Sequence, residues 1–67
     1  MPKASQVLAT LKRDGWIEDR RHGSHRVLVK DSVSRTWAHH DGKDLGRVQM
    51  AQIANDFGYT LEQLRAL

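Results

Sequence analysis

A stretch that reads Arg-Arg-His-Gly-Ser-His-Arg, at positions 20–26, holds the residue types best suited to chemistry on a phosphate. Gly23-Ser24 is typical of a tight turn, because glycine adopts positive φ without steric cost. Val27-Leu28-Val29 then predicts a strand, which would begin beside His25. Histidines titrate near neutral pH, so an imidazole amid fixed positive charge suits general acid or base catalysis. From the residues alone, a hairpin with an ordinary basic turn remains an open alternative.

Basic side chains flank this histidine along the sequence, and no acid lies between positions 20 and 30. Such side chains give affinity for an RNA backbone with little sequence information. The candidates are Arg20, Arg21, Arg26 and Lys30. Strand alternation places Arg20 and Arg21 on opposite faces, so at most one of them is well placed. The alternative is a solvated hairpin surface, and Ser24 either donates to a phosphate or completes the turn.

Metal chemistry is not expected, although the chain holds histidines at positions 22, 25, 39 and 40. Structural zinc sites usually include cysteine, which is absent here, and adjacent histidines on a strand point to opposite faces. We therefore expect neither a metal ion nor another cofactor, and we place His22 and His39 on the surface.

Apolar spacing predicts the helices that would support the hairpin. One set, Ala4, Val7, Leu8 and Leu11, recurs at i, i+3, i+4 and i+7, and the other, Met50, Ile53, Ala54 and Phe57, repeats that pattern. The first helix is expected to begin at a Ser5 cap and to end at Gly15. The second is expected to end at Gly58, before a short helical turn capped by Thr60 and Gln63.

Between the helices, residues 16–21, 25–30 and 35–39 are predicted as strands, with turns at 22–24 and 31–34. The expected fold class is α+β, an αβββα arrangement like that of double-stranded-RNA-binding domains. Its three-stranded antiparallel sheet would carry two main helices on one face, with Trp16 and Trp37 in the core. Residues 1–67 are expected to form a single domain.

The composition favours a basic protein outside membranes. The formal charge is +3 and the isoelectric point about 9.8, which fits a nucleic-acid-binding module. No apolar run approaches the roughly 20 residues of a membrane span, and the first residues lack the apolar core of a signal peptide. The absence of cysteine fits a reducing cytoplasm.

Several of these landmarks, in this order, resemble the HicA family of bacterial toxin ribonucleases. They are Gly15-Trp16, Arg20, Gly23-Ser24-His25, His40 with Lys43-Asp44-Leu45, and a closing helix over 48–58. There are two departures. Gly46-Arg47-Val48 stands where the family usually has a glycine and a small or hydroxyl residue, and Asp41 stands where a proline often follows the second histidine.

The resemblance implies a metal-independent endoribonuclease that cleaves mRNA in a bacterial cytoplasm, with His25 as its single catalytic histidine. It also implies the αβββα fold and a HicB-like antitoxin as the partner that neutralises the toxin. The expected RNA contacts are Arg20, Ser24, Arg26, Lys30, His40 and Lys43. His40 is equally compatible with a loop histidine bonded to backbone. Two alternatives stay open: a non-catalytic RNA-binding module, and a degenerate toxin that acts only as an antitoxin partner.

Overall fold

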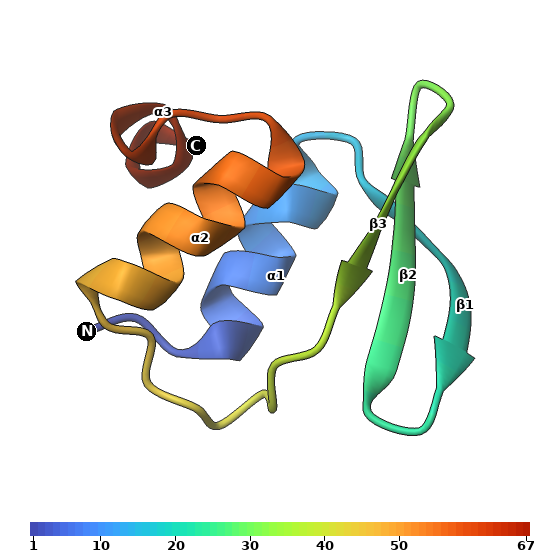
Figure 1. Ribbon diagram of the computed structural model, residues 1–67, viewed down its shortest axis with the longest axis horizontal. Helices are drawn as coiled ribbons and strands as arrows, with labels where there is room; N and C mark the ends of the chain where they lie inside the picture. Colours follow the sequence, from blue (N-terminus) through green and yellow to red (C-terminus); the bar gives the residue numbers. More distant parts are fainter.

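A computed structural model describes residues 1–67 as three helices and one three-stranded sheet (Figure 1). The elements are α1 (Ala4–Arg13), β1 (Ile17–His22), β2 (His25–Lys30), β3 (Val33–Trp37), α2 (Arg47–Phe57) and α3 (Leu61–Ala66). The strands are antiparallel in the order β1-β2-β3, and α1 and α2 both lie on one side of the sheet. The predicted α+β class and αβββα arrangement are confirmed, with α3 as the expected short final helix. None of the helices has the length and apolarity needed to span a bilayer.

The two main helices form where the apolar spacing predicted them. All eight residues of the two spaced sets are buried. Gly15 (φ 107°) and Gly58 (φ 83°) adopt the left-handed conformation after α1 and α2, which glycine reaches without strain. Thr60 and Gln63 form the predicted capping box of α3.

The start of α1 differs from the prediction, because Ser5 lies inside the helix and Lys3 is the N-cap. The first amides of a helix need acceptors from elsewhere. Here the amides of Ala4 and Ser5 donate to the carbonyls of Lys43 (2.8 Å) and Asp41 (3.0 Å). The loop before α2 thus caps α1, a tertiary contact that local sequence does not reveal.

The second turn of the sheet is also shorter than predicted. The β2–β3 turn contains only Asp31 and Ser32, so β3 begins at Val33 rather than at residue 35 and ends at Trp37. Both turn residues have positive φ, 48° and 71°, as in the tight hairpins that match strand twist. The first strand likewise runs one residue later than predicted, over 17–22.

Both tryptophans belong to the core between sheet and helices, as expected. Trp16 and Trp37 are buried, and each meets the Phe57 ring edge-on, with centroids 4.8 Å and 6.2 Å apart. Leu28 supplies the centre of the sheet and is fully buried. This single core fixes the sheet against α1 and α2.

A polar network at the edge of the core joins three segments that are distant in the sequence. The Asp14 carboxylate after α1 accepts hydrogen bonds from the Lys30 ammonium of β2, at 2.9 Å, and from the Tyr59 hydroxyl. The Trp16 indole N–H donates to the same hydroxyl at 3.0 Å. The hydrogen bond from Tyr59, and after it that from Lys30, hold the pKa of Asp14 below its usual value.

Replacement of this carboxylate, Asp14→Asn, should therefore flatten the acid dependence of stability. A carboxyl with a lowered folded pKa contributes stability above its unfolded pKa, near 3.9, and loses it as the pH falls through the folded value. Urea unfolding between about pH 2 and 5 measures this slope, which we expect to be shallower in the variant. Asp31→Asn, at a carboxylate that takes part in none of the six ion pairs, is the matched control. Equal slopes for wild type and Asp14→Asn would contradict the expectation.

Candidate nucleic-acid interface

Strand alternation gives β2 one face toward the helices and one open face. Leu28 is buried against the core, so Arg26 and Lys30, two residues on either side of it, share the helix-facing side. His25, Val27 and Val29 lie on the other side. No helix covers that side of the sheet (Figure 1). We refer to it as the open face.

The β1–β2 register shows which residues of β1 share the open face. The β1–β2 register shifts between Glu18 and Arg20, which leaves Asp19 as an extra residue. Beyond the bulge, Arg20 pairs with Val27 and His22 pairs with His25. Because paired residues of neighbouring strands point to the same face, Arg20 and His22 join His25 on the open face.

His25 is the first residue of β2 and is exposed. It follows a two-residue turn in which Gly23 has φ 61°, so glycine suits this position for its conformation. A Cβ atom at Gly23 would meet nothing within 4 Å, which means that conformation rather than space favours glycine. The turn therefore presents His25 to solvent at the end of the sheet.

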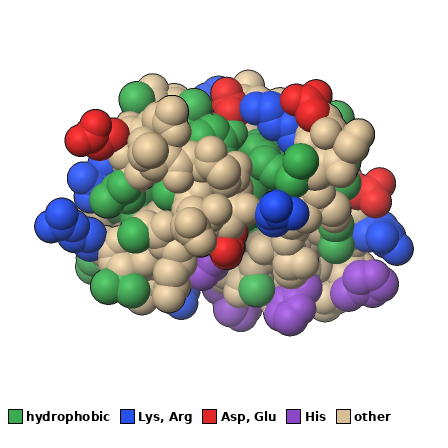
Figure 2. Space-filling model, turned by 45° about the horizontal axis from the view of Figure 1, so that its top comes forward, with side chains coloured by type: hydrophobic (Ala, Val, Ile, Leu, Met, Phe, Trp, Pro, Cys, Tyr) green, Lys and Arg blue, Asp and Glu red, His purple; other side chains and the backbone are tan.

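A concavity of about 190 Å³ lies on the helix-facing side of the same hairpin end. Its lining comes from the hairpin and the loop after β3: Arg21, Ser24, Arg26, His39, His40, Asp41 and Gly42. The structure thus brings together Ser24, Arg26 and His40 among the predicted RNA contacts. His25 is not part of this lining. In Figure 2 the histidine side chains gather along one edge of the molecule.

Arg26 is held in place by two carboxylates. Its guanidinium lies 3.6 Å from Glu18 of β1 and 3.4 Å from Asp41 of the loop, and only 14% of the side chain is exposed. The Arg26 side chain is therefore restricted to fewer conformations than an arginine on an open surface. A guanidinium has five N–H donors, so Arg26 can still donate to a phosphate bound in the concavity that it lines.

His39 differs from the prediction, which placed it on the surface. The imidazole is half-buried and packs edge-on against Trp37, with ring centroids 5.0 Å apart. Burial, and after it the charge of Lys43, lower the pKa of His39. The lowered pKa favours the neutral imidazole, which packs the loop on the core.

The fold compensates the positive charge that the sequence concentrates between residues 20 and 30. Carboxylates from other segments or from the bulge pair with three of the four cations there. Asp19 pairs with Arg20 at 3.5 Å, Glu18 and Asp41 pair with Arg26, and Asp14 pairs with Lys30 at 2.9 Å. Arg21 has no carboxylate partner and donates instead to the Gly23 carbonyl, at 3.4 Å.

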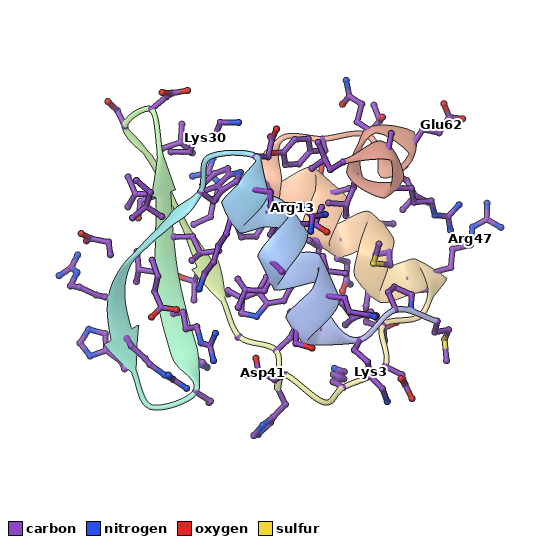
Figure 3. The ribbon with its side chains drawn as sticks, turned by 180° about the vertical axis from the view of Figure 1, so that it is seen from behind. Lys3, Arg13, Lys30, Asp41, Arg47 and Glu62 are labelled. Carbon is purple, nitrogen blue, oxygen red and sulfur yellow. The ribbon has the colours of Figure 1, made fainter.

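Lys30 is not brought together with His25. Lys30 ends β2, away from the Gly23-Ser24 turn, and Figure 3 shows it far from Asp41, the loop residue that pairs with Arg26. The hydrogen bond to Asp14 raises the pKa of Lys30. No group of three or more histidines, aspartates and glutamates lies close enough to hold a metal ion. The prediction that His22 lies on the surface agrees with its exposure, but the sequence reasoning did not pair His22 with His25. The two-residue turn between them was the signal, because the residues that flank such a turn are cross-strand partners.

The element order and the three-stranded antiparallel sheet define the class of small α+β domains with the αβββα arrangement of double-stranded-RNA-binding domains. A family model described as HicA toxin of bacterial toxin-antitoxin matches residues 4–63. The chain therefore belongs to the HicA toxin family of bacterial toxin–antitoxin systems, which confirms the resemblance seen in the sequence. The comparisons with curated proteins and with solved structures give no match.

Proposed function

We propose that this protein is a metal-independent endoribonuclease that cleaves mRNA in the bacterial cytoplasm, with His25 as its catalytic residue. The observation that carries the proposal is the exposed His25 at the end of the open face, in a chain of the HicA toxin family. An enzyme for a polymer needs its catalytic group on an accessible surface, and this histidine is reached from solvent without any opening of the fold.

His25 would act as the general base. Its neutral imidazole takes the proton of a ribose 2′-hydroxyl, and the oxygen attacks the adjacent phosphorus. The bond from phosphorus to the 5′-oxygen then breaks. The products are a 2′,3′-cyclic phosphate and a free 5′-hydroxyl. Arg20, on the same face, can stabilise the charge that develops on the phosphoryl oxygens.

The RNA would run across the end of the hairpin. Arg26, Ser24 and His40 line the concavity on one side of the Gly23-Ser24 turn, and His25 lies on the other side. Lys43 lies in the same loop as His40, and its backbone amide donates to the His40 carbonyl at 3.0 Å. Lys30 lies at the far end of the hairpin with its ammonium on Asp14, so it falls outside this path.

A HicB-like antitoxin would neutralise the enzyme by covering this end of the sheet. Membership in a toxin–antitoxin family implies an antitoxin partner. The molecule exposes 4443 Å², and a partner that buries about 800 Å² per side would cover a large share of it. Occupation of the histidine-bearing end would exclude RNA from His25.

Incubation of the purified protein with a defined RNA in the presence of a chelator tests the proposal. We expect endonucleolytic cleavage that the chelator does not reduce. Tight RNA binding without cleavage would contradict the enzyme and support the non-catalytic RNA-binding module. Neither binding nor cleavage, together with antitoxin binding, would support the degenerate toxin.

Removal of the open-face arginine, Arg20→Gln, should make RNA binding less sensitive to salt. Its side chain is 69% exposed, and Asp19 is its carboxylate partner. Loss of one phosphate contact with a single strand lowers the slope of log affinity against log salt by about 0.7. Fluorescence anisotropy across a salt series, in a cleavage-inactive background, measures the slope.

Arg47→Gln is the charge-matched control for this experiment. Arg47 begins α2, and Figure 3 shows it on the side of the molecule away from the sheet. Its removal should leave the slope unchanged. An Arg20→Gln slope equal to that of Arg47→Gln would mean that RNA does not contact Arg20.

A further inference from the structure

His22 and His25 form a histidine pair across the end of the sheet. They are cross-strand partners on either side of the Gly23-Ser24 turn, so their side chains share the open face. Directly paired residues have Cβ atoms about 4.5–5.5 Å apart. Both histidines are exposed, and no helix lies above them. Two imidazoles can therefore reach one phosphodiester group at the same time.

We propose that His22 is a second catalytic residue, the general acid that protonates the leaving 5′-oxygen. The inference rests on the proposed ribonuclease function and completes its proton transfers. Attack by the 2′-oxygen places the nucleophile and the leaving group on opposite sides of the phosphorus, so two separate groups are well placed to carry the two protons. His25 carries the first proton, and its direct cross-strand partner is a second titratable group on the same face.

The reaction balances with these two groups. Neutral His25 accepts the 2′-hydroxyl proton as the 2′-oxygen bonds to phosphorus. The phosphorus–oxygen bond to the 5′-oxygen breaks, and protonated His22 donates its proton to that oxygen. His25 ends protonated and His22 neutral, and proton exchange with water restores both groups. No oxidant, metal ion or further reactant takes part.

Few charged groups share the open face with the histidine pair. Arg20, two residues before His22, is the cation of the hairpin that shares the open face, and Asp19 in the bulge pairs with it at 3.5 Å. The facing residues of β3, Ser34 and Thr36, carry no charge. The helices lie behind the sheet (Figure 1).

On the helix-facing side of the same hairpin end, the loop after β3 contributes His39, His40 and Asp41, and Asp41 pairs with Arg26. The two limbs of a pH profile are therefore assigned by variants of His22 and His25.

An RNA whose scissile 5′-oxygen is replaced by sulfur separates the two roles. A thiolate leaves without a proton, so it removes the need for a general acid but not for a base. His22→Gln should cleave the all-oxygen RNA about 10²–10⁴-fold more slowly than wild type. The same variant should cleave the sulfur-bridged RNA within a few-fold of wild type. His25→Gln should be slow on both substrates.

The pH profile provides a second, independent readout. Wild type should show a bell-shaped profile, because the base must be neutral and the acid protonated. His22→Gln should keep the fall in rate at low pH and lose the fall at high pH. Ser34→Ala, a small change on the same face, is the control and should keep both limbs. All reactions contain a chelator, so that a metal ion bound by the two imidazoles cannot supply the activity.

The outcomes distinguish failure of this inference from failure of the proposed function. A wild-type protein that never cleaves RNA contradicts the proposed function. Wild-type rates for His22→Gln on the all-oxygen RNA, with His25→Gln inactive, overturn the inference alone. Slow cleavage of both substrates by folded His22→Gln, or rescue of His25→Gln by sulfur, overturns the assignment of His22 as the acid.

Discussion

His25→Gln should lose RNA cleavage by about 10²–10⁴-fold, the usual contribution of a positioned proton-transfer group. Glutamine keeps the size and polarity of the side chain but cannot act as a base near neutral pH. The residue is exposed at a strand end and contributes no core contact, so the fold and its melting temperature should not change. Single-turnover cleavage of a defined RNA, with circular dichroism as the check on folding, measures both effects.

The effect of the same variant can also be measured as bacterial growth. Expression of the wild-type protein without an antitoxin should arrest growth, and expression of His25→Gln should not. A folded His25→Gln protein that cleaves RNA at the wild-type rate would remove His25 from the mechanism. The histidine would then be a surface residue of the hairpin.

Leu28→Ala should destabilise the fold more than any surface change. Leu28 is fully buried at the centre of the middle strand. Truncation of a buried leucine costs about 2–5 kcal/mol, through lost transfer energy and a residual cavity. Native domains have only about 0.05–0.15 kcal/mol of stability per residue, so this loss is a large share of the total. Thermal unfolding should show a melting temperature lower by at least about 8 °C.

Val48→Ala is the matched control for this prediction. Val48 lies on α2 with 67% of its surface exposed, so truncation should change stability by less than about 0.5 kcal/mol. A Leu28→Ala protein as stable as Val48→Ala would contradict the packing of β2 against the helices. The proposed site depends on that packing, because the contact of Leu28 with the helices determines which side of the hairpin is left open to solvent.

Periodicity and glycine positions were enough to predict the helices and the first hairpin. The spacing of Leu11 and Phe57 within their apolar sets identified the buried faces, because a helix repeats every 3.6 residues. Gly23 located the turn before His25. These features depend on local chemistry, which a short window of sequence contains.

The remaining features depend on contacts between distant segments. The carboxylates that pair with Lys30 and Arg26 come from other elements. The run of basic residues in the sequence therefore suggested more unpaired positive charge on the hairpin than the folded protein has. The turn at Asp31-Ser32 places two non-glycine residues at positive φ, against their usual preference. The bulge at Asp19 has no clear sequence signal, yet it determines that Glu18 pairs with Leu28 on the helix-facing side, where its carboxylate reaches Arg26.

The roles of the site residues remain predictions, and the most direct test of the central claim changes a single atom of the substrate. The cleavage site is first mapped on an all-ribose RNA with chelator present, and that one nucleotide is then made 2′-deoxy. We expect the ribose substrate to give 2′,3′-cyclic phosphate and 5′-hydroxyl ends. We expect the deoxy substrate to bind equally well, as an inhibitor of cleavage, and to remain uncut at that position. Cleavage at the deoxy nucleotide, or 5′-phosphate ends, would contradict attack by the 2′-hydroxyl and the role of His25 as its base.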